Sequence, residues 1–149
     1  MFKPVLLFWE PNFLVDVEGE YIINLIVSDG IFSSEPNPVI VTAIPPEDAV
    51  QETLTDVNEI VIDLPDESLK NTNSKIALSN KIDAASTMIK LGLYEDALDK
   101  LQNDILQKTD GCATESSPDK NDWIITCENQ AIVYPLILRA IELLERLLE

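Results

Sequence analysis

The sequence predicts an α+β protein whose strands precede its helices. Two segments, residues 21–27 and 38–43, are rich in β-branched and aromatic side chains, which favour strands. Further along, apolar residues recur every three or four positions in four separate stretches, as on the buried faces of amphipathic helices. Pro45 and Pro46 stand between the two patterns and favour a stiff joint. We therefore expect a β unit over residues 1–46 and a helical unit over residues 47–149.

The composition argues against several classes of function. The chain has 27 acidic and 10 basic residues, a formal net charge of −17, which repels nucleic acids and anionic membrane surfaces. It contains no histidine, so Ser-His-Asp catalysis and paired-histidine zinc sites are excluded. Two cysteines cannot form a four-thiolate metal site. No apolar run reaches the length of about 18 residues that a membrane span requires.

The β half is expected to contain a hairpin. Residues 21–27 and 38–43 form its strands, and a turn at Ser28, Asp29 and Gly30 follows the first. Residues 13–15 are a short third strand. Tyr21 is placed where a tyrosine corner would bond its hydroxyl group to upstream backbone.

The same half contains a spaced set of aromatic, acidic, glycine and apolar residues: Phe13, Asp16, Gly19, Tyr21, Leu25, Val27, Asp29, Gly30, Ser33, Ser34, Val39 and Val41. In these residues it resembles the carboxyl-terminal part of a polycystic-kidney-disease (PKD) type immunoglobulin-like module. The resemblance implies an antiparallel β-sandwich, but it covers only about 45 residues of the roughly 100 that such a sandwich needs. We therefore expect a partial sandwich that packs on the helical half or on a second copy of itself.

The helical half is expected to be a four-helix up-down bundle, with approximate helices at residues 48–64, 73–91, 93–108 and 123–148. Pro65 should end the first helix, Asn73 or Ser74 should cap the second, and Gly92 should end it in the left-handed conformation. Pro135 should bend the last helix or mark a new first turn. Four apolar stripes support these helices: Val50, Leu54, Val57, Val61 and Leu64; Leu78, Ile82, Ala85 and Ile89; Tyr94, Leu98, Leu101 and Ile105; and Val133, Ile137, Ala140, Leu144 and Leu147.

A second resemblance concerns these helices. The residues that carry it are Asn80, Lys81, Ile82, Ala85, Gly92, Tyr94, Ala97, Leu101, Ala131 and Ala140. In these residues the helices are similar to the small all-helical modules of FIMAH type that follow immunoglobulin-like domains in secreted prokaryotic proteins. A tetratricopeptide repeat is the competing interpretation, since Gly-x-Tyr-x-x-Ala also occurs there, but no 34-residue self-similarity supports it.

Cys112 and Cys127 flank a polar loop between the third and fourth helices. A disulfide between them would stabilise the fold by about 3 kcal/mol through loop closure and would indicate an oxidising compartment. The alternative is two free thiols, one of them buried.

The same loop is a candidate calcium site formed by Asp110, Asp119, Asn121 and Asp122, because hard cations prefer carboxylate and amide oxygens at close spacing. The alternative is that Asp119 or Asn121 caps the following helix while the other acids are solvated. Asp16, Glu18 and Asp29 invite the same comparison, although Asp29 before Gly30 is typical of a turn.

Two further hypotheses concern side chains that are spread along the chain. Trp9, Trp123, Tyr94 and Tyr134 would form a sugar-stacking platform if they came together, but core packing is the simpler expectation. A pair of carboxylates would support hydrolysis only if a cleft brought them face to face. The sequence shows no catalytic constellation.

These observations predict a non-catalytic structural or interaction module. It would act as a spacer or a protein–protein contact at the cell surface or outside the cell, within a longer exported precursor. Its expected partners are other protein domains or a second copy of itself. The alternative is a carbohydrate- or peptide-binding accessory module of a secreted enzyme.

Overall fold

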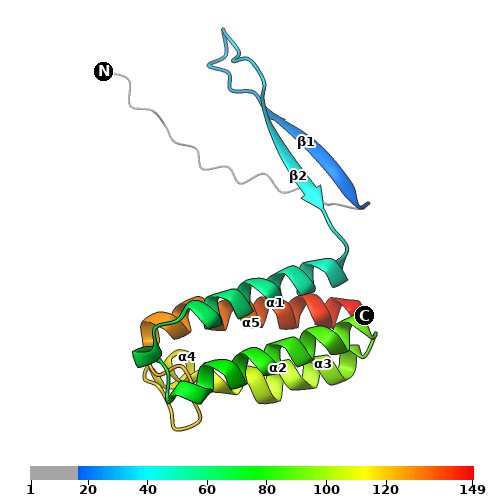
Figure 1. Cartoon of the computed structure of the whole chain (residues 1–149). Helices are drawn as coiled ribbons and strands as arrows, with labels where there is room; N and C mark the ends of the chain where they lie inside the picture. Colours follow the sequence, from blue (N-terminus) through cyan, green and yellow to red (C-terminus); the bar gives the residue numbers. More distant parts are fainter. Residues whose placement is uncertain (1–16) are drawn as a thin grey trace, which may run out of the picture. The chain divides into compact units, whose positions relative to one another are not determined.

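The computed structural model describes residues 17–149, so the predicted strand at 13–15 and the side chains of Trp9 and Asp16 lie outside the described residues. The chain divides into two compact units, Met1–Ile44 and Pro45–Glu149. The first contains an antiparallel two-stranded sheet and the second contains the helices (Figure 1). The α+β class and the change from strands to helices at the prolines are confirmed.

The strands are β1, Gly19–Leu25, and β2, Asn37–Ala43, which pair with Gly19 opposite Ala43 and Leu25 opposite Asn37. In the connection, Gly30 has a φ of +92°, and the Asp29 carboxylate accepts hydrogen bonds from the backbone N–H groups of Ile31 and Phe32 at 2.9 and 2.8 Å. These backbone hydrogen bonds lower the pKa of Asp29. Asp29 is therefore a turn residue, as its position before glycine predicts.

The expected tyrosine corner is present. The Tyr21 hydroxyl group donates to the Val17 carbonyl oxygen at 2.6 Å and accepts from the Val17 N–H group at 3.2 Å. This bond pair fixes the entry of the chain into β1.

The first two long helices are α1, Pro46–Asp63, and α2, Thr72–Lys90, with the 3-10 turn η1, Asp66–Ser68, between them. A proline in the first turn suits a helix start, since the missing N–H group would have no partner there. Pro65 follows the end of α1 and Gly92, with φ +74°, follows the end of α2, as predicted. The N-cap of α2 is Asn71, whose side chain accepts from the Asn73 N–H group, so the expectation of Asn73 or Ser74 was wrong.

The sequence predicts one helix over residues 93–108, but the third helical segment of the structure is not one regular α-helix. It consists of α3, Tyr94–Lys100, a π-helical turn η2, Leu101–Ile105, and a 3-10 turn η3, Leu106–Lys108. Ala97, Leu101 and Ile105 are buried and follow each other at steps of four residues. Such steps drift around a regular α-helix, and the wider π turn offsets the drift, which keeps all three side chains in the core.

The last long helix, α5, spans Cys127–Leu147 and contains Pro135 in its interior, whereas the sequence predicted a start near residue 123. Residues 123–126 are instead not helical and form the extended segment before α5, in which Ile124 makes an antiparallel β-bridge to Leu69 and Thr126 has an extended backbone. The Trp123 N–H group donates to the Lys108 carbonyl oxygen at 2.8 Å, and the Ile125 N–H group donates to the Ser68 carbonyl oxygen at 2.8 Å. Ile124 is buried beside Leu69, so this segment closes one end of the core before α5 begins.

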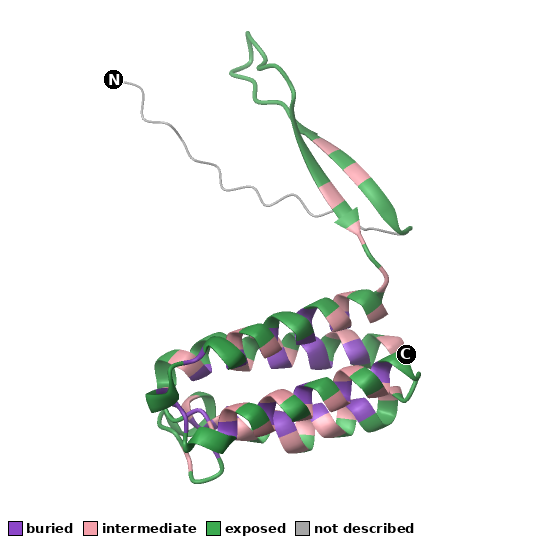
Figure 2. Ribbon diagram, viewed as in Figure 1, coloured by how far each residue is buried: buried purple, intermediate pink, exposed green. Residues whose placement is uncertain are grey.

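The core of the second unit lies between α1, α2, the third segment and α5. Helix α1 contacts α2 and α5, and α2 contacts α3 and η2. Nineteen buried apolar residues form the interior, and they include most of the predicted stripe residues. Figure 2 shows that buried positions recur along the long helices. No helix of the described residues is long and apolar enough to cross a membrane.

A salt-bridge cluster joins α2 to the third segment. The Asp104 carboxylate lies 2.7 Å from the Lys81 ammonium group and 3.2 Å from that of Lys100. Partial burial favours the neutral acid, but the hydrogen bonds from Lys81 and Lys100 outweigh it and lower the pKa of Asp104 below 3.8. The cluster therefore contributes stability above about pH 4, and this stability is lost as the pH falls through the lowered pKa.

We predict that Asp104→Asn lowers the free energy of unfolding by about 0.5 kcal/mol at pH 7, because Asp104 is partly exposed and such pairs are screened by water. The difference from wild type should shrink at an acidic pH below the lowered pKa, where the carboxyl group is protonated in both the folded and the unfolded state. Urea unfolding followed by circular dichroism measures it. Glu142→Gln, at an exposed position of α5, is the control; an equal loss at both pH values in Asp104→Asn would contradict the electrostatic account.

Candidate functional site

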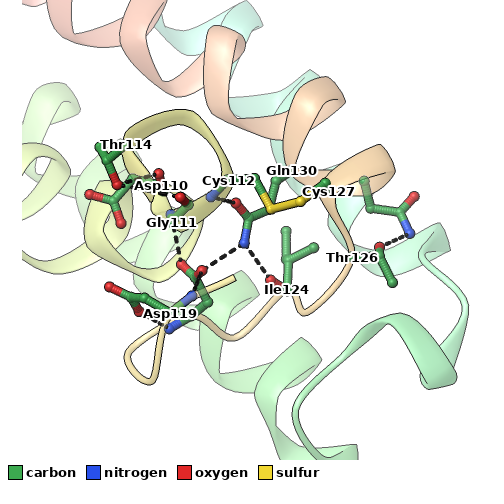
Figure 3. The surroundings of a disulfide bond; sticks show 11 residues. Asp110, Gly111, Cys112, Thr114, Asp119, Ile124, Thr126, Cys127 and Gln130 are labelled. Carbon is green, nitrogen blue, oxygen red and sulfur yellow. Dashed lines mark hydrogen bonds between the residues drawn. A yellow bond between two sulfur atoms is a disulfide. The ribbon is translucent and has the colours of Figure 1, made fainter. Parts of the chain in front are cut away.

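The predicted disulfide is present. Cys112, in the short helix α4, Gly111–Glu115, is bonded to Cys127, the first residue of α5, with their Cα atoms 5.4 Å apart (Figure 3). The bond closes the polar loop that precedes α5. The disulfide therefore fixes both ends of residues 112–127 to each other at the start of α5. This loop contains most of the candidate site residues that the sequence predicts.

A buried polar network lies beside the disulfide (Figure 3). The Gln130 side chain is 1% exposed. Its Oε1 accepts from the Cys112 N–H group at 2.8 Å, and its Nε2 donates to the Ile124 carbonyl oxygen at 2.7 Å and to Asp122 Oδ2 at 2.8 Å. Gln130 thus connects α4, the extended segment and the loop from one position of α5.

Asp122 is fully buried within this network. Besides Gln130, its carboxylate accepts from the Asp119 N–H group at 2.7 Å and from the Gly111 N–H group at 3.4 Å. A buried carboxylate is costly unless hydrogen bonds compensate for the lost water, and here three N–H donors supply them. Sequence reasoning missed Gln130 and the structural role of Asp122. The sequence did carry one indication: Gln130 lies three residues before Val133 and so extends the apolar stripe, which places a polar side chain on the buried face of the helix.

Of the four proposed calcium ligands, Asp119 and Asp122 already use carboxylate oxygens as hydrogen-bond acceptors. Asp122 accepts the three bonds above, and Asp119 Oδ1 accepts from the Asn121 and Asp122 N–H groups. Asp119 thereby stabilises its own turn and does not cap a helix near residue 123. Burial raises the pKa of Asp110, and the charges of Asp122, Asp119 and Glu115 add to the increase.

Within residues 17–149, no group of three or more His, Cys, Asp or Glu side chains is arranged to hold a metal ion. Calcium binding by Asp110, Asp119, Asn121 and Asp122 therefore stays a prediction. It would require Asp122 to give up N–H partners that also hold the loop together.

A mainly apolar cavity of about 350 Å³ lies beside the disulfide. Two of its polar side chains are already engaged, since the Gln130 amide is in the network and Thr109 Oγ1 donates to the Leu106 carbonyl oxygen at 3.0 Å. The cavity is suited to a small apolar group and offers no paired carboxylates. It is lined by Thr109, Cys112, Ala113, Ser116, Cys127, Gln130, Ala131 and Tyr134.

Among the aromatic residues that the structure describes, Tyr94 and Trp123 do not share a stacking platform. Tyr94 donates to Glu47, at the start of α1, at 3.0 Å, and this hydrogen bond raises the pKa of Tyr94. Trp123 packs on the core with the Lys81 and Lys108 ammonium groups 5.5 and 5.4 Å from its ring centre. Its backbone bonds to Lys70, beyond the end of α1, so Tyr94 and Trp123 lie at opposite ends of that helix. Trp9 lies outside the described residues.

Comparisons of the chain with protein-family models, with curated proteins and with solved structures returned no match.

We predict that Gly111→Ala lowers the free energy of unfolding by about 1–3 kcal/mol, the usual cost of overpacking. A Cβ atom at this buried position would lie less than 3.0 Å from the Asp122 carboxylate and from backbone atoms of Ser117 and Asp119. Ala113→Ser, at an exposed position of the same helix, should change stability by less than about 0.5 kcal/mol. Urea unfolding compares the two variants. Equal stability of Gly111→Ala and wild type would contradict the prediction, because it would show that the residues around position 111 can move to accommodate a Cβ atom without loss of stability.

We predict that reduction of the disulfide lowers the free energy of unfolding by about 3 kcal/mol, the loop-closure value for a ring of this size. The Cys112→Ala/Cys127→Ala double variant should lose a similar amount and should not respond to reductant. Alkylation of the denatured chain without reductant should add no label. Alkylation of both thiols under those conditions would show that the bond does not form.

Proposed function

We propose that this chain is a non-catalytic interaction module of an extracellular or cell-surface protein, in which the β unit makes protein–protein contacts and the helical unit acts as a spacer. The observation that supports this most directly is that the described part of the β unit, residues 17–44, contains no buried residue. Every described residue before residue 45 is exposed or only half-buried. A two-stranded hairpin is marginally stable by itself in water, so the unit needs another surface to cover it.

The register identifies the face that needs covering. Side chains of directly opposed residues point to the same side of an antiparallel pair. Tyr21 pairs with Val41 and Ile23 pairs with Val39, and Leu25 continues the same face, which is therefore apolar. Ile22 and Ile40 share the opposite face with polar residues that include Glu20, Asn24 and Thr42.

The partner that we propose for this face is another protein domain or a second copy of the chain. In its finer description, the β unit is the carboxyl-terminal half of a PKD-type sandwich, and the partner supplies the opposing sheet. Val39 is 52% exposed and Leu25 is 59% exposed, which is unfavourable for large apolar side chains in a face that remains in water.

The helical unit fits the role of a rigid spacer. We interpret it as a four-helix up-down bundle whose last connection is held by the disulfide. A structural disulfide persists in oxidising compartments, which supports a location outside the cell or at its surface. The high negative charge would keep such a module soluble.

The test is the state of association of the full chain. We expect sedimentation velocity to show self-association that the Leu25→Lys/Val39→Lys double variant weakens by about tenfold, as for loss of a central apolar contact. Ile22→Lys/Ile40→Lys carries the same charge change on the opposite face and is the matched control.

Limited proteolysis completes this test. No Lys or Arg lies between Lys3 and Lys70, so trypsin cannot cut the hairpin and thermolysin is the suitable protease. We expect residues 17–44 to be protected in the associated chain. A monomer from which thermolysin removes this segment rapidly would contradict the proposal.

A further inference from the structure

A groove of about 560 Å³ runs between α1 and α5 on the helical unit. Its apolar part is formed by Ile60 and Leu64 of the α1 side and by Ile132 and Leu136 of α5. Ile132 is 48% exposed, so a large apolar side chain faces water at this place. The groove therefore offers area that a partner could bury.

The charged residues on the α1 side of the groove are all acidic. Asp56, Glu59 and Asp63 line it, and Glu52 continues the series, with steps of four, three and four residues along one side of the helix. None of these four carboxylates takes part in the ion pairs found among residues 17–149. The nearest basic residues in the sequence are Lys3 and Lys70.

This arrangement works against the stability of α1 itself. Like charges three or four residues apart repel each other on a helix surface. Asp63 lies in the last turn, which contains no basic residue, and an acid there opposes the helix dipole. Departures from local rules are expected where a surface serves a function, and a positively charged partner would remove the repulsion.

We propose that the α1–α5 groove binds a basic amphipathic helix of a partner protein. Apolar side chains of that helix would lie on Ile60, Ile132 and Leu136, and its Lys or Arg side chains would pair with Asp56, Glu59 and Asp63. Helix-in-groove recognition has this combination of apolar anchors and charged flanks. A second copy of the chain that brought its own α1–α5 face to this groove is disfavoured as the occupant, because it would place the same carboxylates against Asp56, Glu59 and Asp63.

The probe is a fluorescent synthetic 18-residue peptide of Leu and Lys with helical amphipathic spacing, titrated with the full chain and followed by fluorescence anisotropy. Ile132→Ser should weaken binding by about tenfold, because it removes an exposed apolar anchor. Ile76→Ser, at a 64% exposed position of α2, is the matched control and should bind as wild type.

The charge requirement is tested with two double variants that remove two negative charges each. Asp56→Asn/Glu59→Gln should weaken binding about tenfold at low salt, and the loss should diminish as salt screens the charges. Glu115→Gln/Glu142→Gln, whose exposed positions lie outside the groove, should change binding less than twofold.

Three outcomes would overturn the proposal: no binding of the peptide, equal weakening by both charge variants, or weakening by Ile76→Ser as large as by Ile132→Ser. A dimer that Ile132→Ser dissociates would assign the groove to a second copy instead. Leu25→Lys/Val39→Lys should bind the peptide as wild type does, so failure of the hairpin proposal and failure of this one are distinguishable.

Discussion

The Gln130 side chain is the contact on which the organisation of the helical unit's closed end depends. It is buried in α5, yet it bonds to the backbone of α4, to the extended segment before α5 and to the Asp122 carboxylate. A buried polar group without a hydrogen-bond partner lowers the stability of the fold far more than an exposed one does, because the exposed group can bond to water. The loop must therefore adopt the conformation that satisfies Gln130 and Asp122 together, and that conformation brings Cys112 to Cys127.

This network gives two of the loop acids, Asp119 and Asp122, a structural role. The Asp122 carboxylate accepts hydrogen bonds from Gly111, Asp119 and Gln130. Position 111 must be glycine because a Cβ atom there would collide with this carboxylate. A loop rich in carboxylates resembles a metal site in sequence, but the structure uses the same oxygen atoms as hydrogen-bond acceptors for its own backbone. The distinction depends on where the N–H groups point, which spacing along the chain does not encode.

Local patterns predicted those elements whose causes are local. The stripe of Val50, Leu54, Val57 and Val61 is buried as expected, Pro65 and Gly92 end helices, and Tyr21 makes its corner bond. The misses depend on tertiary contacts. Residues 123–125 do not continue α5 because their N–H groups bond to the carbonyl oxygens of Ser68 and Lys108. The π turn keeps residues that are four positions apart on the core side of the third segment. The network around Gln130 joins residues 18 positions apart and was not predicted.

The position of the disulfide has a mechanical consequence. Helices α1 and α5 run side by side in opposite directions, so the start of α1 and the end of α5 lie at the same end of the helical unit (Figure 1). A load pulling on these two ends would peel the helices apart turn by turn, instead of shearing all their contacts at once. The disulfide between Cys112 and Cys127 would keep the chain between these two residues from being pulled out, which shortens the fully extended unit by about 50 Å. The cross-link would thus set the limit to which this unit can stretch under tension.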